Sequence, residues 1–403
     1  GSHLASMPLD VRLAKVCVYG VLLRCVDPML TVAACLSGRS PFRNPGTDPQ
    51  RRQESEAAQR ALAWGNSDHL TMGNAYNKWR AAGSRSAKSK VVNDYSLSFE
   101  SLQNIEDVRN DLAAALAEMG FLPGRQGKET GHAAVASAQA AGKDLHRSVT
   151  TLSEPIDNGW GRYGECSAAV NACAQDATIL RSALCAGLYP HVAKVVTPGD
   201  RFDETAFGTT KAKFSAKELK FYTLAGVADE DAPGDAAAGA GGGSGGDGNR
   251  VAVWRGIPQQ RVFIHPASVC FNTGNFPSPW LVYHEKVATS KVFVRDVTVA
   301  SPYALLLFGG HDSVAAAALG DAPPGKAGAE GEAVRVEHSD GLVYVGRYSW
   351  MKFKAPARLG VLVRGLRAAL DELLKWKIAE PSVDIATSPV VDAVLRLLAG
   401  HGF

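Results

Sequence analysis

The chain has 403 residues, of which 46% are apolar, and its formal net charge is only +3. This length is enough for two or three domains that each bury a hydrophobic core. The small net charge excludes a general electrostatic attraction to nucleic acid, so any nucleic-acid-binding surface must be a local concentration of basic residues.

The N-terminal region predicts neither a signal peptide nor a membrane span. Gly1–Met7 resembles a vector-derived leader and is set apart from the fold. The apolar stretch Val16–Leu36 is interrupted by Arg24 and Asp27, and charges at the middle of a bilayer are costly. The seven cysteines form no Cys-x-x-Cys pair, which favours free buried thiols in the reducing cytoplasm or nucleus.

Helical periodicity dominates the first half and predicts a helical domain over residues 8–192. Asp27-Pro28 has the pattern of an N-cap followed by proline at the first helical position. Gly124–Asp144 is rich in Gly, Ala, Lys and Gln, so we expect a disordered insertion over about residues 124–155. The expected helices are Val11–Val26, Pro28–Ser37, Asp48–Trp64, Asp68–Ala82, Phe99–Met119 and Glu165–Ala186.

Short apolar runs separated by turn residues follow the helical half, with strand character from about Val192. Such spacing is typical of a β-barrel or sandwich, and the predicted β domain covers residues 193–348. Two glycine-rich stretches, about 229–249 and 315–332, are expected to be flexible insertions within it. The clearest runs are Arg261–Phe271, Trp280–Val287, Lys291–Val299 and Tyr303–Phe308.

The last segment, residues 349–403, returns to helical periodicity. Between Arg347 and Lys377 there are eight basic and two acidic residues, which is a local excess of positive charge. Arg358, Arg364 and Arg367 lie off the apolar face and would form either electrostatic contacts or a solvated surface. Ser388-Pro389 predicts the start of a final helix. The apolar face comprises Leu359, Leu362, Val363, Leu366, Leu370, Leu373 and Leu374.

No pattern in the sequence predicts a self-contained catalytic, cofactor or metal site. Gly241–Gly246 fits G-x-G-x-x-G but lies in a glycine tract without a following helix. Gly320–Lys326 resembles a Walker A loop until Ala327 replaces the required Ser or Thr. Ser67-Asp68-His69 contains the residue types of a catalytic triad, but neighbours on one helical turn do not converge. We expect Ser67 or Asp68 to cap a helix instead.

Polar residues around two of the predicted strands are the candidates for binding. Lysine and arginine would contact phosphates there, and hydroxyls would donate to phosphate or sugar oxygens. A solvated hairpin tip is the alternative interpretation. Tyr283, Phe293 and Tyr303 would stack on bases or pack in the core. The polar candidates are Lys286, Thr289, Ser290, Lys291 and Arg295.

Several motifs resemble the C-terminal region of DEAH/RHA-type RNA helicases over about Leu9–Pro381, apart from the loops. Cys25–Phe42 and Ser67–Leu70 are similar to the family's helical ratchet, or helicase-associated (HA2), domain. Trp350–Arg358 is similar to the C-terminal extension of the RHA-like branch. The oligonucleotide/oligosaccharide-binding (OB) fold is resembled by Ile264–Val269, Val282–Val287, Thr289–Asp296 and Ser301–Leu306.

The resemblance implies an α+β multidomain protein: an N-terminal helical bundle (ratchet), an OB-fold β-barrel and a C-terminal helical extension. It implies that ratchet and barrel line an RNA channel of an ATP-dependent 3′–5′ helicase. The expected partners are RNA, either single-stranded or structured and including G-quadruplexes, and two RecA-like motor domains that hold ATP and Mg²⁺. The implied RNA-binding residues are Lys286, Thr289, Ser290, Lys291, Arg295 and Tyr303, with Arg39 and Ser40 from an Arg-Ser-Pro-Phe motif.

The motor motifs themselves are not found in this sequence. There is no Walker A loop, no Asp-Glu-x-His box and no arginine-finger motif. We therefore expect a C-terminal fragment without ATPase activity, whose parent protein is an enzyme. The competing hypothesis is a protein-docking platform, in which the C-terminal helices and insertions recruit ribosomal or regulatory partners.

Overall fold

The fold is taken from a computed structural model. The leader at 1–7, the insertion at 124–155 and the stretches at 229–249 and 315–332 lie outside the residues it describes. Those residues are 10–122, 170–198, 202–205, 208–211, 214–224, 251–254, 257–310, 334–337, 342–345, 350–381, 383, 385 and 388–400.

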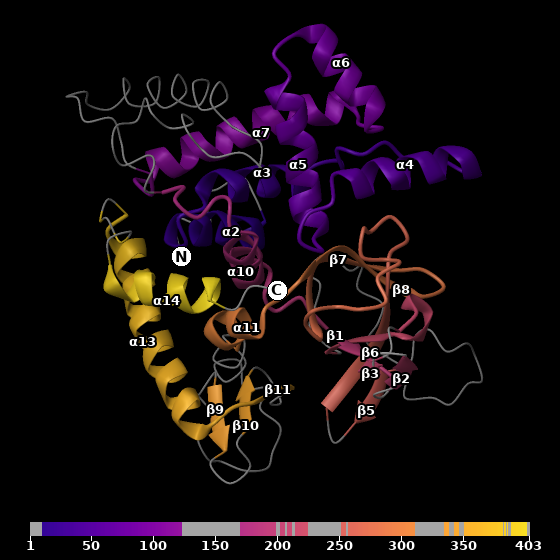
Figure 1. Cartoon of the computed structure of the whole chain (residues 1–403). Helices are drawn as coiled ribbons and strands as arrows, with labels where there is room; N and C mark the ends of the chain where they lie inside the picture. The colour runs from indigo at the N-terminus through magenta and orange to yellow at the C-terminus, as the bar shows by residue number, and fades with distance from the viewer. Residues whose placement is uncertain are drawn as a thin grey trace, which may run out of the picture.

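The N-terminal helical domain was predicted correctly in outline (Figure 1). One helix, α6, was missed because its segment is polar and lacks an apolar stripe; only Val92 is buried. Ser67 is the N-cap of α5, with its Oγ accepting from the amide of Leu70 at 3.1 Å. The described helices are α2 (Val11–Leu22), α3 (Val26–Leu36), α4 (Pro49–Ala61), α5 (Asp68–Ala81), α6 (Arg85–Asp94) and α7 (Phe99–Glu118).

The start of α3 differs from the prediction. The helix begins at Val26 after Cys25, so Asp27 is not its N-cap. Asp27 instead forms a buried ion pair with Arg109 of α7. The Arg109 Nε also donates to Thr31 Oγ1 at 2.9 Å. A carboxylate that neutralises a buried guanidinium is held in the core by that charge, which explains why a cap motif was not used as a cap.

The helix α10 (Ala177–Leu188) is shorter than predicted. It begins at Ala177 because Asp176 accepts from the amides of Thr178 and Ile179 at 2.8 and 3.2 Å. Residues 170–175 form turns, and residues 165–169 lie outside the described ranges. α10 is buried against α2, where Gly187 faces the backbone of Val16.

A closed five-stranded barrel follows the helices, as predicted. Its strands pair in the order β4-β1-β7-β8-β6, and β6 returns to pair with β4. The β6–β8 pair is parallel and the others are antiparallel. This is the Greek-key barrel of an OB-fold. Its strands are β1 (Val192–Val196), β4 (Lys220–Leu224), β6 (Ile257–Ile264), β7 (Trp280–Ala288) and β8 (Val292–Val299).

Shorter strands extend the barrel. β5 (Val251–Trp254) adds to the edge of β6, and β2 (Phe202–Thr205) pairs with β3 (Gly208–Lys211) in the connection from β1 to β4. A further sheet, outside the barrel, has the order β11-β10-β9. The predicted domain at 193–348 therefore contains strands of two sheets. The second sheet comprises β9 (Val334–Glu337), β10 (Leu342–Val345) and β11 (Met351–Lys354).

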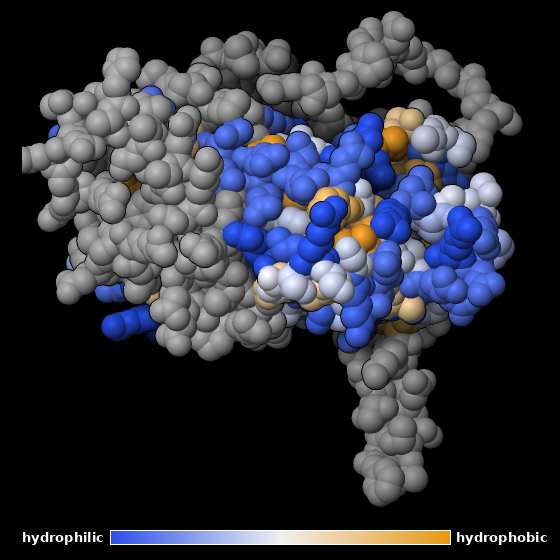
Figure 2. Space-filling model, turned by 90° about the horizontal axis from the view of Figure 1, so that it is seen from above, coloured by the Kyte–Doolittle hydropathy of each residue, from blue (hydrophilic) through white to orange (hydrophobic). Residues whose placement is uncertain are grey.

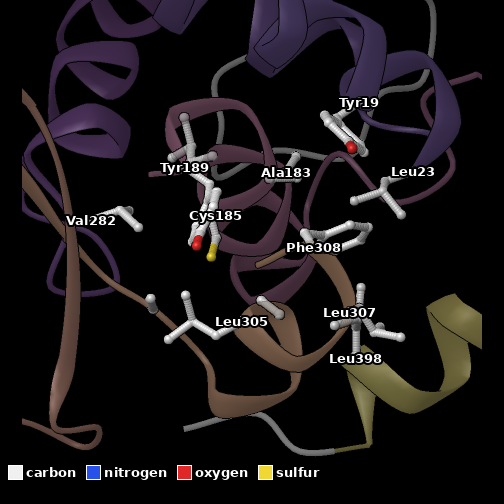
Figure 3. Close-up of a cluster of buried hydrophobic side chains, with 14 of the residues drawn as sticks. Tyr19, Leu23, Ala183, Cys185, Tyr189, Val282, Leu305, Leu307, Phe308 and Leu398 are labelled. Carbon is white, nitrogen blue, oxygen red and sulfur yellow. The ribbon is translucent and has the colours of Figure 1, made fainter. Parts of the chain in front are cut away.

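The run Tyr303–Phe308 was predicted as a strand and is the helix α11 (Pro302–Phe308). Ser301 caps it by accepting from the amide of Tyr303 at 3.2 Å, and Pro302 occupies the first turn. Figure 3 shows Leu305, Leu307 and Phe308 among side chains from α2, α10 and α14. The ring of Phe308 lies 5.3 Å from that of Tyr19, in an edge-to-face arrangement. A short, fully apolar run does not distinguish helix from strand.

The C-terminal helices α13 (Ala357–Ala379) and α14 (Pro389–Ala399) share this core. The predicted apolar face of α13 is buried or half-buried except at Leu362, which is 68% exposed. Arg367 was assigned to the surface and is buried instead, donating to the carbonyl of Leu306 at 2.7 Å. An arginine off the apolar face thus joins α13 to α11.

Candidate nucleic-acid interface

Ser67-Asp68-His69 at the start of α5 joins the helical domain to the barrel. Ser67 Oγ and His69 Nδ1 each lie 2.6 Å from Thr298 Oγ1 in β8. The two carboxylate oxygens of Asp68 accept from the amides of Val269 and Val297 at 2.8 and 2.7 Å. The triad-like sequence is therefore a docking contact, which fixes the ratchet against the strand that carries Arg295.

Burial shifts the pKa values of the titratable groups at this junction. It raises the pKa of Asp68 to about 6, against hydrogen bonds from Ser268, Val297 and Val269 that lower it. Burial, then the charge of Asp68, raises the pKa of Asp296 to about 7. Burial lowers the pKa of His69 to about 3, so its ring is neutral at pH 7. The junction consequently holds two weakly acidic carboxyl groups.

A cavity of about 70 Å³ opens between the helical domain and the barrel. Ser40 contributes from the segment after α3, and Arg295 and Asp296 contribute from β8. His265, which directly follows β6, is also part of the lining, and the other polar residues are Gln59, Asp68, Thr71 and Ser268. The structure thus brings together two residues of the Arg-Ser-Pro-Phe motif, Ser40 and Phe42, and one residue of the predicted barrel site, Arg295. Arg39 is exposed beside Ser40 but does not line this cavity.

The other predicted site residues lie on the hairpin that joins β7 to β8. Thr289, Ser290 and Lys291 are exposed at its tip, where the Thr289 amide and hydroxyl both donate to the carbonyl of Lys291, at 2.9 and 3.2 Å. Lys286, on β7, is half-buried and stands opposite Val294 in the register. Arg295 and Glu285 stand opposite each other, with charged atoms 3.7 Å apart.

Next to the hairpin, the outer face of the barrel carries aromatic and basic side chains, of which the sequence predicted Lys291 and Phe293 but not Arg261 and Phe263. Lys291 Nζ lies 4.8 Å from the ring centroid of Phe263, and the Arg261 guanidinium lies 5.0 Å from the same centroid. Phe263 and Phe293 face each other across the parallel β6–β8 pair, with centroids 6.1 Å apart. We call Tyr222, Arg261, Phe263, His265, Lys291 and Phe293 the outer barrel face.

Strand alternation was the signal that would have located this face. Val262 and Ile264 are buried, so Arg261, Phe263 and His265 point to the other side of β6. Likewise Val292 and Val294 are buried while Phe293 and Arg295 point outward. β6 pairs with β8, and each paired residue of β6 lies opposite a residue 30 positions later in the chain. This pairing is a long-range contact, which local sequence patterns do not predict.

Tyr303 was predicted to bind RNA, and Tyr283 was predicted either to stack on bases or to pack in the core. Tyr303 belongs to the first turn of α11 and packs, half-buried, against the core that α11 shares with α10 and α14. Tyr283 is buried inside the barrel and stacks on His191 at 5.0 Å between centroids. Neither residue belongs to the outer barrel face, whereas Phe293 does.

The part of the chain that the structure describes contains no group of three or more His, Cys, Asp or Glu side chains placed to hold a metal ion. Within those same residues, no helix has both the length and the apolar character needed to cross a membrane.

Family comparisons agree with this architecture. Residues 10–72 match the helicase-associated domain (HA2), ratchet-like, and residues 180–312 match the oligonucleotide/oligosaccharide-binding (OB)-fold family. Residues 348–400 match the C-terminal domain in RNA helicases. Fold and matches together define the class as the C-terminal region of a nucleic-acid helicase.

Relatives of known name resemble almost the whole chain. It is 30% identical over 407 residues to the putative ATP-dependent RNA helicase DHX57 of Mus musculus, covering 99% of this chain. It is 25% identical over 402 residues to the ATP-dependent RNA helicase DHX29 of Homo sapiens, and 27% identical over 384 residues to the ATP-dependent DNA/RNA helicase DHX36 of Mus musculus, covering 99% and 94% of this chain. The chain spans about a quarter of these relatives, namely 24%, 22% and 28% of their lengths. It belongs to the DEAH-box RNA helicase family.

Proposed function

We propose that this chain grips single-stranded or structured RNA through the β7–β8 hairpin and the outer barrel face, as part of an ATP-dependent 3′–5′ helicase. The observation that carries the proposal is the clustering of cations and aromatic rings beside that hairpin. Lys291 and Arg261 flank the ring of Phe263. Aromatic rings provide stacking platforms for bases, and the cations attract the phosphates between them.

The junction with the ratchet extends this surface. Ser40 and Arg295 line one cavity, so a strand that crosses the hairpin would reach the Arg-Ser-Pro-Phe segment of the helical domain. The Asp68 and Ser67 contacts to β8 hold both halves in place. This arrangement supports a channel wall built jointly by ratchet and barrel. We propose that ATP and Mg²⁺ act in RecA-like motor domains, because the chain has no Walker A loop.

The test is a triple charge reversal of Lys286, Lys291 and Arg295 to glutamate. Binding of a fluorescent oligouridylate should fall steeply, and the slope of log affinity against log salt should decrease by about 2, since each phosphate contact on a single strand contributes roughly 0.7. A matched triple reversal at Lys354, Arg358 and Lys375 keeps the same net charge on another face. If the hairpin triple binds RNA like the unchanged chain at low salt, the barrel is not the grip; an equal loss in both triples would indicate a general effect of charge.

A second candidate function is protein docking, favoured by exposed apolar residues on α13. Val361, Leu362 and Trp376 are 47%, 68% and 50% exposed. Substituting Leu362 and Trp376 with aspartate should abolish retention of a ribosomal or regulatory partner while leaving RNA binding unchanged. Truncation near Lys354 would be a poorer test, because it removes Val363, Leu370 and Val391 from the core that they share with α10.

A further inference from the structure

A second cavity, of about 540 Å³, lies between the end of α5, the helix α6 and the start of α7. Figure 1 places α6 at the edge of the helical domain, away from the barrel. Figure 2 looks down on that side and shows mainly hydrophilic residues around a small hydrophobic patch. No motif in the sequence points to this cavity, and the hairpin and outer barrel face do not reach it.

Positive charge predominates around the cavity. Arg85 is exposed, and Lys88 is half-buried with its Nζ 4.0 Å from the ring centroid of Trp79. The acidic residue of the lining, Glu106, is paired with Arg80 at 3.2 Å. The first turn of α6 has no acidic residue, although negative charge is favoured at a helix N-terminus. An anion in the cavity would therefore be attracted by the cations and the helix end together.

The cavity is also lined by an aromatic ring, Phe99, and by Trp79, whose indole N–H has no partner among the described residues. Phe99 is 40% exposed and meets Trp79 edge to face, with centroids 6.1 Å apart. Trp79 is only 1% exposed, and its Nε1 donates to no acceptor among the described residues. A buried donor without a partner is unfavourable, so an acceptor supplied by a ligand would stabilise the site.

We propose that this cavity binds one nucleotide of single-stranded RNA, with the base stacked on Phe99 and the phosphate between Arg85 and Lys88. The amide of Gln103 would contact the edge of the base, and Trp79 Nε1 would donate to the nucleotide. An exposed ring beside cations favours a nucleotide over an acidic peptide, because a carboxylate gains nothing from a stacking platform. The proposal rests on the proposed function, in that the chain handles RNA, but uses a separate surface.

The test compares a fluorescent oligouridylate of about ten nucleotides with an abasic strand of the same length. Phe99→Leu should weaken oligouridylate binding about five- to tenfold, at the lower end of the effect of one stacked base. It should leave binding of the abasic strand unchanged, and Phe99→Tyr should bind like the parent. Arg85→Gln with Lys88→Gln should weaken binding of both strands and reduce the salt slope by about 1. Circular dichroism checks that each variant is folded.

Each outcome separates this site from the hairpin. If the Phe99 and Arg85/Lys88 variants bind RNA like the parent while the hairpin triple does not, the cavity is not an RNA site and the proposed function stands. If the cavity variants lose binding and the hairpin triple does not, the proposed function is wrong and the cavity proposal stands. Equal competition by polyglutamate and oligouridylate, both lost in the Arg85/Lys88 variant, would identify a general anion site and overturn the nucleotide assignment.

Discussion

The imidazole Nδ1 of His69 lies 2.6 Å from the hydroxyl of Thr298, which places a fully buried histidine of the ratchet on a strand of the barrel. The same hydroxyl lies 2.6 Å from Ser67 Oγ. A single side chain of β8 thus connects two residues at the start of α5. This contact orients the strand whose next outward residue, Arg295, faces the junction cavity.

We expect Thr298→Val to destabilise the chain by about 1–3 kcal/mol, because it preserves the shape of the side chain and leaves the buried His69 Nδ1 without its partner. Ser67 Oγ loses one of its two hydrogen bonds and still accepts from the amide of Leu70. Urea unfolding measures the change. Thr289→Val, at the exposed hairpin tip, is the control and should change the unfolding free energy by less than about 0.5 kcal/mol. Equal effects of the two substitutions would mean that the Thr298 hydroxyl does not hold the junction.

Asp296→Asn should stabilise the protein above pH 7. The pKa of Asp296 is raised from 3.8 to about 7 in the folded protein. The free energy of unfolding therefore falls as the pH rises between these two values, and it stays at the lower level above pH 7. The amide removes this ionisation and tolerates the left-handed backbone at this position, where φ is +52°. The expected gain is about 1–2 kcal/mol at pH 8.

The measurement for Asp296→Asn is the difference in unfolding free energy between variant and parent from pH 4 to pH 8. The difference should vanish near pH 4. His69 acts in the opposite direction below pH 6.5, because its neutral ring gains a proton on unfolding. That effect is common to both proteins and cancels. A difference that does not vary with pH would show that Asp296 is ionised normally.

The ion pair of Arg109 with Asp27 gives a prediction for the helical core. Arg109→Met should destabilise by about 3–5 kcal/mol, because it leaves the Asp27 carboxylate buried without its counter-charge. The double substitution Arg109→Met with Asp27→Leu should be less destabilising than Arg109→Met alone. Thermal and urea unfolding of the single and double variants measure this coupling. Additive losses would contradict the assignment of the pair.

Gly187 allows the close approach of α10 to α2. A Cβ at this position would lie 2.8 Å from the backbone N and Cα of Val16, so Gly187→Ala should cost about 1–3 kcal/mol. The matched control is Gly365→Ala in α13, where a Cβ meets nothing within 4 Å. That substitution should stabilise by about 0.5–1 kcal/mol through helix propensity. The two substitutions should therefore change the free energy of unfolding in opposite directions. A single unfolding assay would then separate the effect of helix packing from that of helix propensity.

Phe263→Leu should weaken RNA binding by about 1 kcal/mol or more without affecting the unfolding transition. Phe263 contacts both Arg261 and Lys291 on the outer barrel face, and leucine retains the apolar contact but not the stacking ring. Tyr303→Leu is the comparison, since Tyr303 packs against the core of α11. A larger loss of RNA affinity for Tyr303→Leu, in a folded protein, would restore the original assignment of that residue.

The elements with strong periodicity were predicted from the sequence. The resemblance to a known family then gave the order of the domains that contain them. The long helix α7, the Ser67 cap and the β7–β8 hairpin follow from local patterns, and the structure contains them. Failures came from tertiary interactions. Asp27 was assigned as a cap because nothing local reveals Arg109, which lies on another helix. α11 was assigned as a strand because six apolar residues have no diagnostic period.

The residues of the candidate site also divide into those that local patterns predict and those that depend on tertiary contacts. Lys291 and Arg295 were found because the hairpin is local, whereas Arg261 and Phe263 were missed because they join it only through the parallel pairing of β6 with β8. Arg367 was predicted to lie on the surface, either in an electrostatic contact or in solvent, because its neighbours define an apolar face without it. Its guanidinium is oriented by the carbonyl of Leu306, more than 60 positions earlier.

The core that α13 and α14 share with α10 and α11 has a mechanical consequence. Val363 and Leu370 of α13 and Leu398 of α14 belong to the same buried cluster as Leu184 and Phe308. Sliding one helix past the others would expose apolar surface and break dense packing. Because the same cluster includes Val192 and Trp280 of the barrel, any movement of α10 would carry α13, α14 and this side of the barrel with it as one body.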